Sequence, residues 1–211
     1  MITLALSKGR MLKQILPMLE QIDILAQDDP YTSRKLIFAT NHPQIQFVIL
    51  RASDVATYVQ FGAADVGFVG KDSLMEHGGD GLCELLDLNI SKCRLMTAVP
   101  AAALHKPRSN QRIKVATKYI KLARQYYQSQ GIQAEIIRLS GAMELAPLVG
   151  LADEIVDLVE TGNTLKANNL VEQDFIANIS CRLIANAASM RTDHQAIAKL
   201  QQELAAVVAR A

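Results

Sequence analysis

Short apolar runs alternate with segments whose apolar residues recur at helical spacing along most of the chain. This alternation predicts an α/β fold with a largely parallel sheet, because parallel strands need long connections that are usually helical. We predict strands at 2–6, 36–39, 47–50, 65–69, 84–88, 95–99, 113–116, 134–139 and 154–159. We predict helices at 12–22 (kinked at Pro17), after residue 53 (capped by Ser53), from residue 71, and at 120–130, 143–149 and 193–210.

The pattern is interrupted by a polar stretch from Pro100 to Arg112, which we predict to be a loop. The alternation restarts after it, so the sequence predicts two α/β lobes with a cleft between them. We place residues 1–92 and 178–211 in lobe I and residues 93–177 in lobe II. Ligands of open α/β sheets bind beyond the carboxyl ends of strands, so polar residues at those ends are the candidates for a site.

The amino-acid composition is that of a globular protein and argues against several other classes of protein. Of the 211 residues, 50% are hydrophobic and 20% are charged, as in an ordinary globular protein, and the net charge of +1 argues against a strongly basic nucleic-acid surface. The three cysteines (83, 93 and 181) form no C-x-x-C pair, and the four histidines have no metal-ligand spacing. An export signal and a long apolar segment are both missing, so we expect a protein of the reducing cytoplasm that does not span a membrane.

The strongest local signal is a hydrophobic strand that runs into Glu160 and then into the segment Thr161–Thr164. Gly162 permits a sharp turn, and successive N–H groups with the two threonine hydroxyls can bind one phosphate. Carboxylates before such a turn would repel a bare phosphate, but Asp157 and Glu160 can accept hydrogen bonds from sugar hydroxyls. A ribose 5-phosphate combines both features, so we predict that Asp157, Glu160, Thr161, Gly162, Asn163 and Thr164 bind one. A plain turn capped by Thr161 or Asn163 remains the alternative.

Residues 144–165, ELAPLVGLADEIVDLVETGNTL, resemble the signature of the ATP phosphoribosyltransferases, which open histidine biosynthesis, and fit it at every defined position. Three further segments also look like blocks of this family, namely residues 4–10, 65–72 and 115–119. The resemblance therefore covers roughly residues 1 to 190. One departure is Ala142, which stands where family members often have a hydroxyl residue. We therefore expect no side-chain contact with substrate there.

The resemblance implies that the phosphoribosyl group of 5-phosphoribosyl 1-diphosphate is transferred to N1 of ATP with release of pyrophosphate. It places Arg10, Arg34 and Arg51 in the active cleft as catalytic residues near the diphosphate or the ATP phosphates. Guanidinium groups suit this task because they bind phosphate oxygens in pairs and stabilise charge on the leaving diphosphate. We expect further ATP or diphosphate contacts from Lys8, Gly9, Arg10 and Lys71.

Three further expectations follow. A ring nitrogen already carries its lone pair, so no activated Ser, Cys or His is needed. We expect Mg²⁺ on the diphosphate, held by substrate oxygens and water rather than by protein ligands, and we predict that Asp72 caps a helix.

The chain ends at Ala211, which leaves no room for the added domain of long-form members. The resemblance therefore implies the short form, as catalytic dimers in a hetero-oligomer with a regulatory subunit resembling histidyl-tRNA synthetase.

Three alternatives stay open. Periplasmic binding proteins share the two-lobed build, but they carry an export signal. Purine and pyrimidine salvage phosphoribosyltransferases have paired acidic residues directly before the threonines, whereas two residues separate Asp157 from Glu160 here. The third alternative is a regulatory or scaffold protein with a degenerate site.

Overall fold

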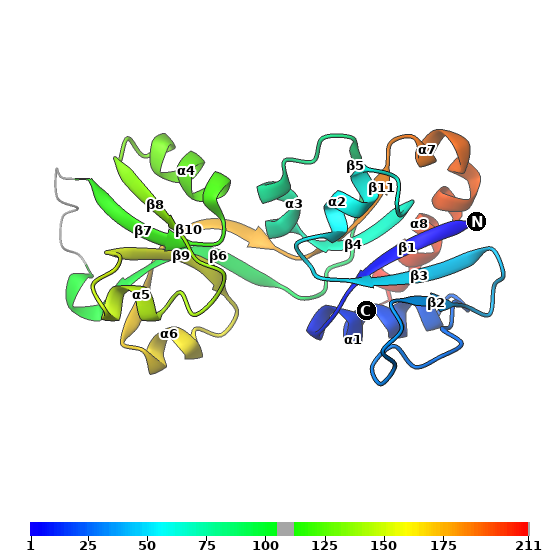
Figure 1. Cartoon of the computed structure of the whole chain (residues 1–211), viewed down its shortest axis with the longest axis horizontal. Coiled ribbons are helices and arrows are strands. Elements are labelled where there is room, and N and C mark those ends of the chain that lie inside the picture. Colours follow the sequence, from blue (N-terminus) through cyan, green and yellow to red (C-terminus); the bar gives the residue numbers. More distant parts are fainter. Residues whose placement is uncertain (105–111, 211) are drawn as a thin grey trace. The chain divides into compact units, whose positions relative to one another are not determined.

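The computed structural model describes residues 1–104 and 112–210. The chain divides into two compact units, and each has a sheet of its own (Figure 1). The first unit comprises Met1–Ser91 and Ser180–Ala211, and the second comprises Lys92–Ile179. Of the predicted loop between Pro100 and Arg112, residues 105–111, with His105, lie outside the described residues.

The first unit contains a six-stranded sheet with the order β2-β3-β1-β4-β11-β5. Its strands are β1 (Ile2–Ser7), β2 (Ile37–Ala39), β3 (Ile45–Leu50), β4 (Val66–Gly70), β5 (Leu82–Asp87) and β11 (Cys181–Asn186), and its helices are α1 (Arg10–Glu20), α2 (Val55–Gln60), α3 (Lys71–His77), α7 (Ser189–Thr192) and α8 (His194–Val208). The three strands β3, β1 and β4 are parallel, whereas β2, β11 and β5 each run antiparallel to their neighbours.

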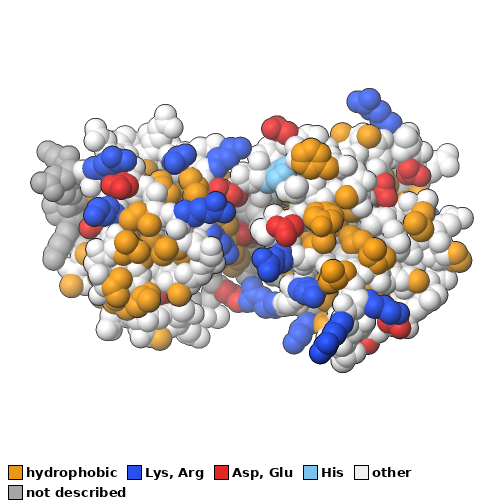
Figure 2. Space-filling model, in the orientation of Figure 1, with side chains coloured by type: hydrophobic (Ala, Val, Ile, Leu, Met, Phe, Trp, Pro, Cys, Tyr) orange, Lys and Arg blue, Asp and Glu red, His pale blue; other side chains and the backbone are white. Residues whose placement is uncertain are grey.

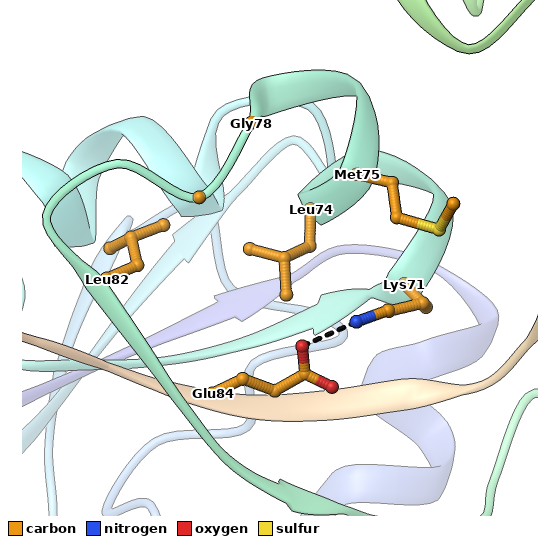
Figure 3. A pocket seen from close by; sticks show the side chains of 7 residues that line it. Lys71, Leu74, Met75, Gly78, Leu82 and Glu84 are labelled. Atoms are coloured by element: carbon orange, nitrogen blue, oxygen red, sulfur yellow. Dashed lines mark hydrogen bonds and ion pairs between the residues drawn. The ribbon is translucent and has the colours of Figure 1, made fainter. Parts of the chain in front are cut away.

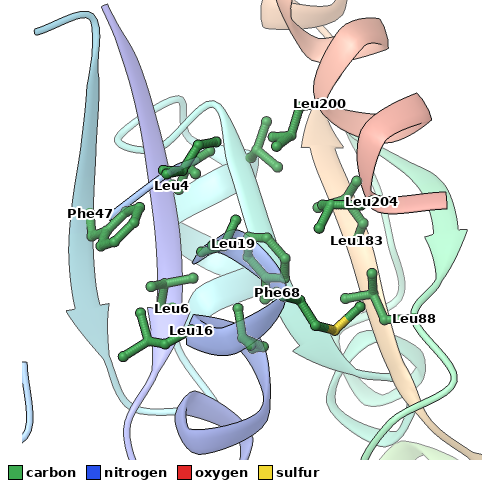
Figure 4. Packing of buried hydrophobic residues seen from close by; sticks show 14 of the residues in the cluster. Leu4, Leu6, Leu16, Leu19, Phe47, Phe68, Leu88, Leu183, Leu200 and Leu204 are labelled. Carbon is green, nitrogen blue, oxygen red and sulfur yellow. The ribbon is translucent and has the colours of Figure 1, made fainter. Parts of the chain in front are cut away.

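Both faces of this sheet are covered, which explains why β1 is a continuous buried run. Leu4 and Leu6 pack into a large cluster with apolar residues of α1 and α8 (Figure 4). Ala5 points to the opposite face and packs with Val55 and Val59 of α2. Successive side chains of a strand alternate between the faces of a sheet, so one short segment supplies two cores.

The second unit contains a five-stranded sheet with the order β10-β6-β9-β7-β8. Its elements are β6 (Cys93–Pro100), the 3₁₀ turn η1 (Ala101–Ala103), β7 (Ile113–Thr117), α4 (Ile120–Ser129), β8 (Ala134–Arg138), α5 (Leu145–Leu148), β9 (Glu154–Val159), α6 (Asn163–Ala167) and β10 (Leu170–Ile179). Strands β8, β7 and β9 are parallel, and β6 and β10 are antiparallel to their neighbours.

The structure corrects several predictions. The expectation of a largely parallel sheet is wrong, because both sheets are mixed: antiparallel strands lie on both sides of the parallel strands in the first unit and on one side of them in the second. Strands β10 and β11 were not predicted at all. Ser53 does not cap α2, since its hydroxyl donates to Asp54 Oδ1 at 2.8 Å. Asp72 does not cap α3 either: Gly70 occupies the N-cap position, and the buried Asp72 lies in the first turn.

Among the described residues, no helix combines the length and apolar character needed to cross a bilayer.

A buried hydrogen bond joins α4 to the start of β9. Tyr127 Oη donates to Glu154 Oε2 at 2.8 Å, and both residues are buried. Replacing Tyr127 by Phe removes the donor and is expected to lower the free energy of unfolding by about 2 kcal/mol, since a buried side-chain acceptor loses a hydrogen bond. Urea denaturation measures this, with Tyr58→Phe on the exposed side of α2 as control. Equal unfolding free energies for the two variants would contradict the expectation.

Candidate active site

The parallel strands of the first unit end at one edge of its sheet. Strands β3, β1 and β4 are neighbours, so the segments that follow them lie side by side. A backbone hydrogen bond of 2.9 Å from Lys8 N to Leu50 O ties the segment after β1 to the end of β3. The residues that come next in the chain are Lys8, Gly9 and Arg10 after β1, Arg51 after β3, and Lys71 after β4. The structure thus brings these predicted site residues to one edge.

Arg34 reaches the same edge by a different route. It precedes β2, and β2 runs antiparallel to β3, so the beginning of β2 lies beside the carboxyl end of β3. The hydrogen bond from Ile49 N to Leu36 O, at 2.8 Å, fixes this pairing. Sequence alone does not indicate that Arg34 belongs to this site, because it precedes a strand and the other cations follow one. The antiparallel direction of β2 explains why it lies at the same edge.

The edge is positively charged and accessible. Four of its cations are exposed, namely Lys8, Arg10, Arg34 and Arg51. Figure 2 shows exposed Lys and Arg side chains on this unit, and others on the second unit. Gly9 has φ of 96°, and apart from its two chain neighbours no described residue comes within 4 Å of the position a Cβ would take there. The backbone before Arg10 therefore leaves room for a bulky anion to approach closely.

Lys71 has a close acidic partner on a neighbouring strand. Its Nζ lies 2.6 Å from Glu84 Oε2 on β5. Both residues line a cavity of about 280 Å³ between α3 and β5, together with Leu74, Met75, Gly78, Gly79 and Leu82 (Figure 3). An anion that binds Lys71 must therefore compete with Glu84.

The second unit has a corresponding edge where β7, β8 and β9 end. The predicted phosphate loop follows β9, and Gly162 adopts the left-handed conformation with φ of 75°. Thr161 Oγ1 accepts a long hydrogen bond from Asn163 N, at 3.4 Å, and no side-chain cap of α6 is found among the described residues. Capping alone therefore does not account for the threonines, and Thr161, Asn163 and Thr164 are all exposed.

The two acidic residues of the signature stand on either side of the strand end. Asp157 lies within β9, half-buried, and its Oδ1 accepts a hydrogen bond from Leu158 N at 2.8 Å. Glu160 is the first residue after β9 and is exposed. Both carboxylates therefore lie close in the chain to the turn at Gly162, as a ribose that carries a 5-phosphate requires.

An ion pair that the sequence did not reveal lies against this turn. The guanidinium of Arg94 contacts both carboxylate oxygens of Glu172, at 2.8 and 2.9 Å. Arg94 pairs in register with Val159, the last residue of β9. Glu172 Oε1 lies 3.2 Å from the position that a Cβ on Gly162 would take. No local signal in the sequence could have indicated this pair, because its members are 78 residues apart.

The thiols of the described chain are buried or partly buried. Burial raises the pKa of Cys181 to about 12, so this thiol stays protonated and packs in the core. Cys83 and Cys93 are free and partly buried. Within residues 1–104 and 112–210, no group of three or more His, Cys, Asp or Glu is arranged to hold a metal ion.

Comparison with known proteins identifies the family. Residues 51–206 match the family model described as ATP phosphoribosyltransferase. The chain belongs to this family. It is 58% identical over 207 residues to the ATP phosphoribosyltransferase of Hahella chejuensis, which covers 98% of the chain and 97% of the relative. The corresponding enzyme of Marinobacter nauticus is 56% identical over 209 residues, which covers 99% and 96%.

Comparison with solved structures supports the same family and the predicted fold. A chain from the ATP phosphoribosyl transferase (HisG:HisZ) complex of Thermotoga maritima matches with a TM-score of 0.87 and 31% identity over the whole of both chains. The periplasmic aliphatic sulphonate binding protein of Escherichia coli matches with a TM-score of 0.58 at 12% identity, which shows a common fold only and confirms the predicted periplasmic-binding-protein-like architecture.

The predicted activity is therefore confirmed. The chain is an enzyme of the ATP phosphoribosyltransferase family, which transfers the phosphoribosyl group of 5-phosphoribosyl 1-diphosphate to N1 of ATP and releases pyrophosphate. This reaction is the first step of histidine biosynthesis. The salvage phosphoribosyltransferases, the binding proteins and a scaffold role are thereby set aside.

Proposed function

We propose that each unit supplies one part of the substrate-binding machinery. In the second unit, corresponding to the predicted lobe 93–177, Thr161–Thr164 bind the 5-phosphate of phosphoribosyl diphosphate, and Asp157 and Glu160 accept hydrogen bonds from the ribose hydroxyls. In the first unit, the cations at the carboxyl edge bind the diphosphate or the ATP phosphates. The gathering of Lys8, Arg10, Arg34, Arg51 and Lys71 at one sheet edge is the observation that carries this proposal.

The chemistry explains the choice of cations. Breaking the bond between the anomeric carbon and the diphosphate builds negative charge on the leaving group and positive charge on the sugar. Fixed guanidinium groups stabilise the first charge without reorganisation, so Arg10, Arg34 and Arg51 are assigned to catalysis. N1 of adenine attacks with its own lone pair, and the remaining task is to hold the reacting atoms in contact.

Mg²⁺ is proposed as a component of the diphosphate substrate. Mg²⁺ usually keeps several waters and binds substrate phosphates, so no protein ligand is assigned to it. When bound, Mg²⁺ neutralises part of the charge on the diphosphate.

A regulatory partner is also proposed. The Thermotoga maritima relative was solved as a HisG:HisZ complex, and the present chain matches its whole length. We therefore assign the chain to the short form, as the catalytic subunit of a hetero-oligomer built from catalytic dimers and a subunit resembling histidyl-tRNA synthetase.

Pyrophosphate release tests the assignment. The purified chain is mixed with ATP, phosphoribosyl diphosphate and Mg²⁺, and parallel reactions contain adenine or orotate in place of ATP. Release only with ATP is expected, whereas release with adenine or orotate would overturn the assignment. Adding the regulatory subunit should raise the activity or make it sensitive to histidine. No effect of that subunit would contradict the proposed short form.

A further inference from the structure

The ion pair between Lys71 and Glu84 is a feature of the cationic edge that opposes anion binding. Lys71 is the first residue of α3 and Glu84 lies on β5, 13 residues later in the chain. Their side chains are 28% and 34% exposed, and both face the cavity between these elements (Figure 3). The pair is thus accessible to a ligand from solvent, and its 2.6 Å separation marks it as fully formed without ligand.

Glu84 has a second cationic neighbour, which has a better partner of its own. Arg182 on β11 lies 3.4 Å from Glu84 Oε1 but only 2.9 Å from Asp87 Oδ2. Asp87 in turn accepts hydrogen bonds from Ser180 Oγ at 2.8 Å and from Asn89 N at 2.9 Å. If Glu84 leaves, Arg182 remains paired with an anchored carboxylate. Lys71 is the cation that loses its partner.

We propose that Glu84 is the built-in counter-ion of Lys71, and that a substrate phosphate displaces it when that phosphate enters the cavity between α3 and β5. A lysine ammonium on a flexible stem with three donors can exchange one anionic partner for another with little rearrangement. Glu84 therefore lowers the affinity of the edge for phosphate and acts as a positioning residue that holds Lys71 in place until substrate arrives.

The inference rests on the proposed role of Lys71 as a phosphate ligand. The same chemistry fits the triphosphate of ATP and the diphosphate of the sugar donor, so the experiment must distinguish these two sources. Pyrophosphate alone serves as the simplest probe.

The test compares the full chain with its Glu84→Gln and Lys71→Met variants and with the double variant. Dissociation constants for pyrophosphate, ATP and phosphoribosyl diphosphate are measured by calorimetry, together with kcat and KM for both substrates. Glu84→Gln should tighten pyrophosphate binding about two- to fivefold, the strength of a partly exposed ion pair. It should also lower the KM of the one substrate whose phosphate meets Lys71. In the Lys71→Met background the same change should have no effect.

Glu203→Gln is the matched control. Glu203 pairs with Lys199 at 3.8 Å on the exposed face of α8, and losing that pair should leave every binding constant unchanged. Rescue by Glu84→Asp, which keeps the charge, should return affinities toward those of the unmodified chain.

The outcomes distinguish a failure of the proposed role of Lys71 from a failure of the proposed role of Glu84. If Lys71→Met weakens no ligand, the proposed role of Lys71 is wrong and the inference falls with it. If Lys71→Met weakens binding but Glu84→Gln leaves it unchanged or weakens it, only the counter-ion role is overturned. Tighter binding by Glu84→Gln in the Lys71→Met background as well would indicate a general charge effect and would also overturn it.

Discussion

Replacement of Arg10 by alanine is expected to lower kcat by about 10²- to 10³-fold, as loss of one fixed donor to a developing negative charge does in other enzymes. Arg10 begins α1 directly after the open turn at Gly9, is exposed, and lies at the edge where the predicted phosphate ligands of the first unit gather. Removing its side chain leaves the buried face of α1 untouched, so the free energy of unfolding should stay close to that of the unmodified protein.

The measurement is initial-rate pyrophosphate release at saturating ATP and phosphoribosyl diphosphate. Lys13→Ala is the matched control, since Lys13 is an exposed cation one turn further along α1. Its turnover should remain within about twofold of the unmodified chain, since surface substitutions away from special features have small effects. Equal turnover of the Arg10 and Lys13 variants would remove Arg10 from the mechanism.

Replacement of Gly162 by alanine is expected to weaken the binding of phosphoribosyl diphosphate about ten- to a hundredfold. The left-handed φ of 75° strains any residue with a Cβ, at a cost of about 1–3 kcal/mol. The added Cβ would also lie 3.2 Å from Glu172 Oε1, so either the turn or the Arg94–Glu172 pair has to move. A turn that moves no longer presents its amides to one phosphate.

A second glycine in the same unit provides a control that separates the effect of backbone strain from the effect of a disrupted binding turn. Gly131, which follows α4, has a nearly equal φ of 69°, and apart from its two chain neighbours no described residue comes within 4 Å of its hypothetical Cβ. Gly131→Ala should therefore cost similar stability but leave the dissociation constant for phosphoribosyl diphosphate unchanged in calorimetry. If both variants bind the sugar donor equally well, the turn at Gly162 does not hold the 5-phosphate.

Strands β1 to β9 could be predicted from the sequence, whereas β10 and β11 could not. Strand β1 is buried throughout and mostly apolar because helices cover both faces of its sheet, so its pattern is plain. Strand β10 is mostly half-buried, mixes polar with apolar residues, and pairs with β6 through two register shifts. Such a strand is defined by its partner rather than by its own periodicity, which explains why it was missed.

In the candidate site, too, some features could be predicted from the sequence and others could not. The turn at Gly162 and the cations after β1, β3 and β4 are local features, since each follows directly from a strand end. The position of Arg34 depends on the antiparallel pairing of β2 with β3, and no pattern around Arg34 reports that direction. The partner of Lys71 likewise depends on the neighbourhood of α3 and β5. Residue types were therefore predictable, but the pairs they form were not.

The order of strands in the first sheet also constrains how the chain folds as it is synthesised. Strand β5 is joined to the rest of that sheet through β11, which follows the whole second unit in the sequence. A nascent chain that has reached β10 holds every strand of the second unit, while β4 and β5 still lack the strand that lies between them. The second unit can thus complete its sheet before β11 is synthesised, whereas the first unit cannot complete its own sheet until β11 is present.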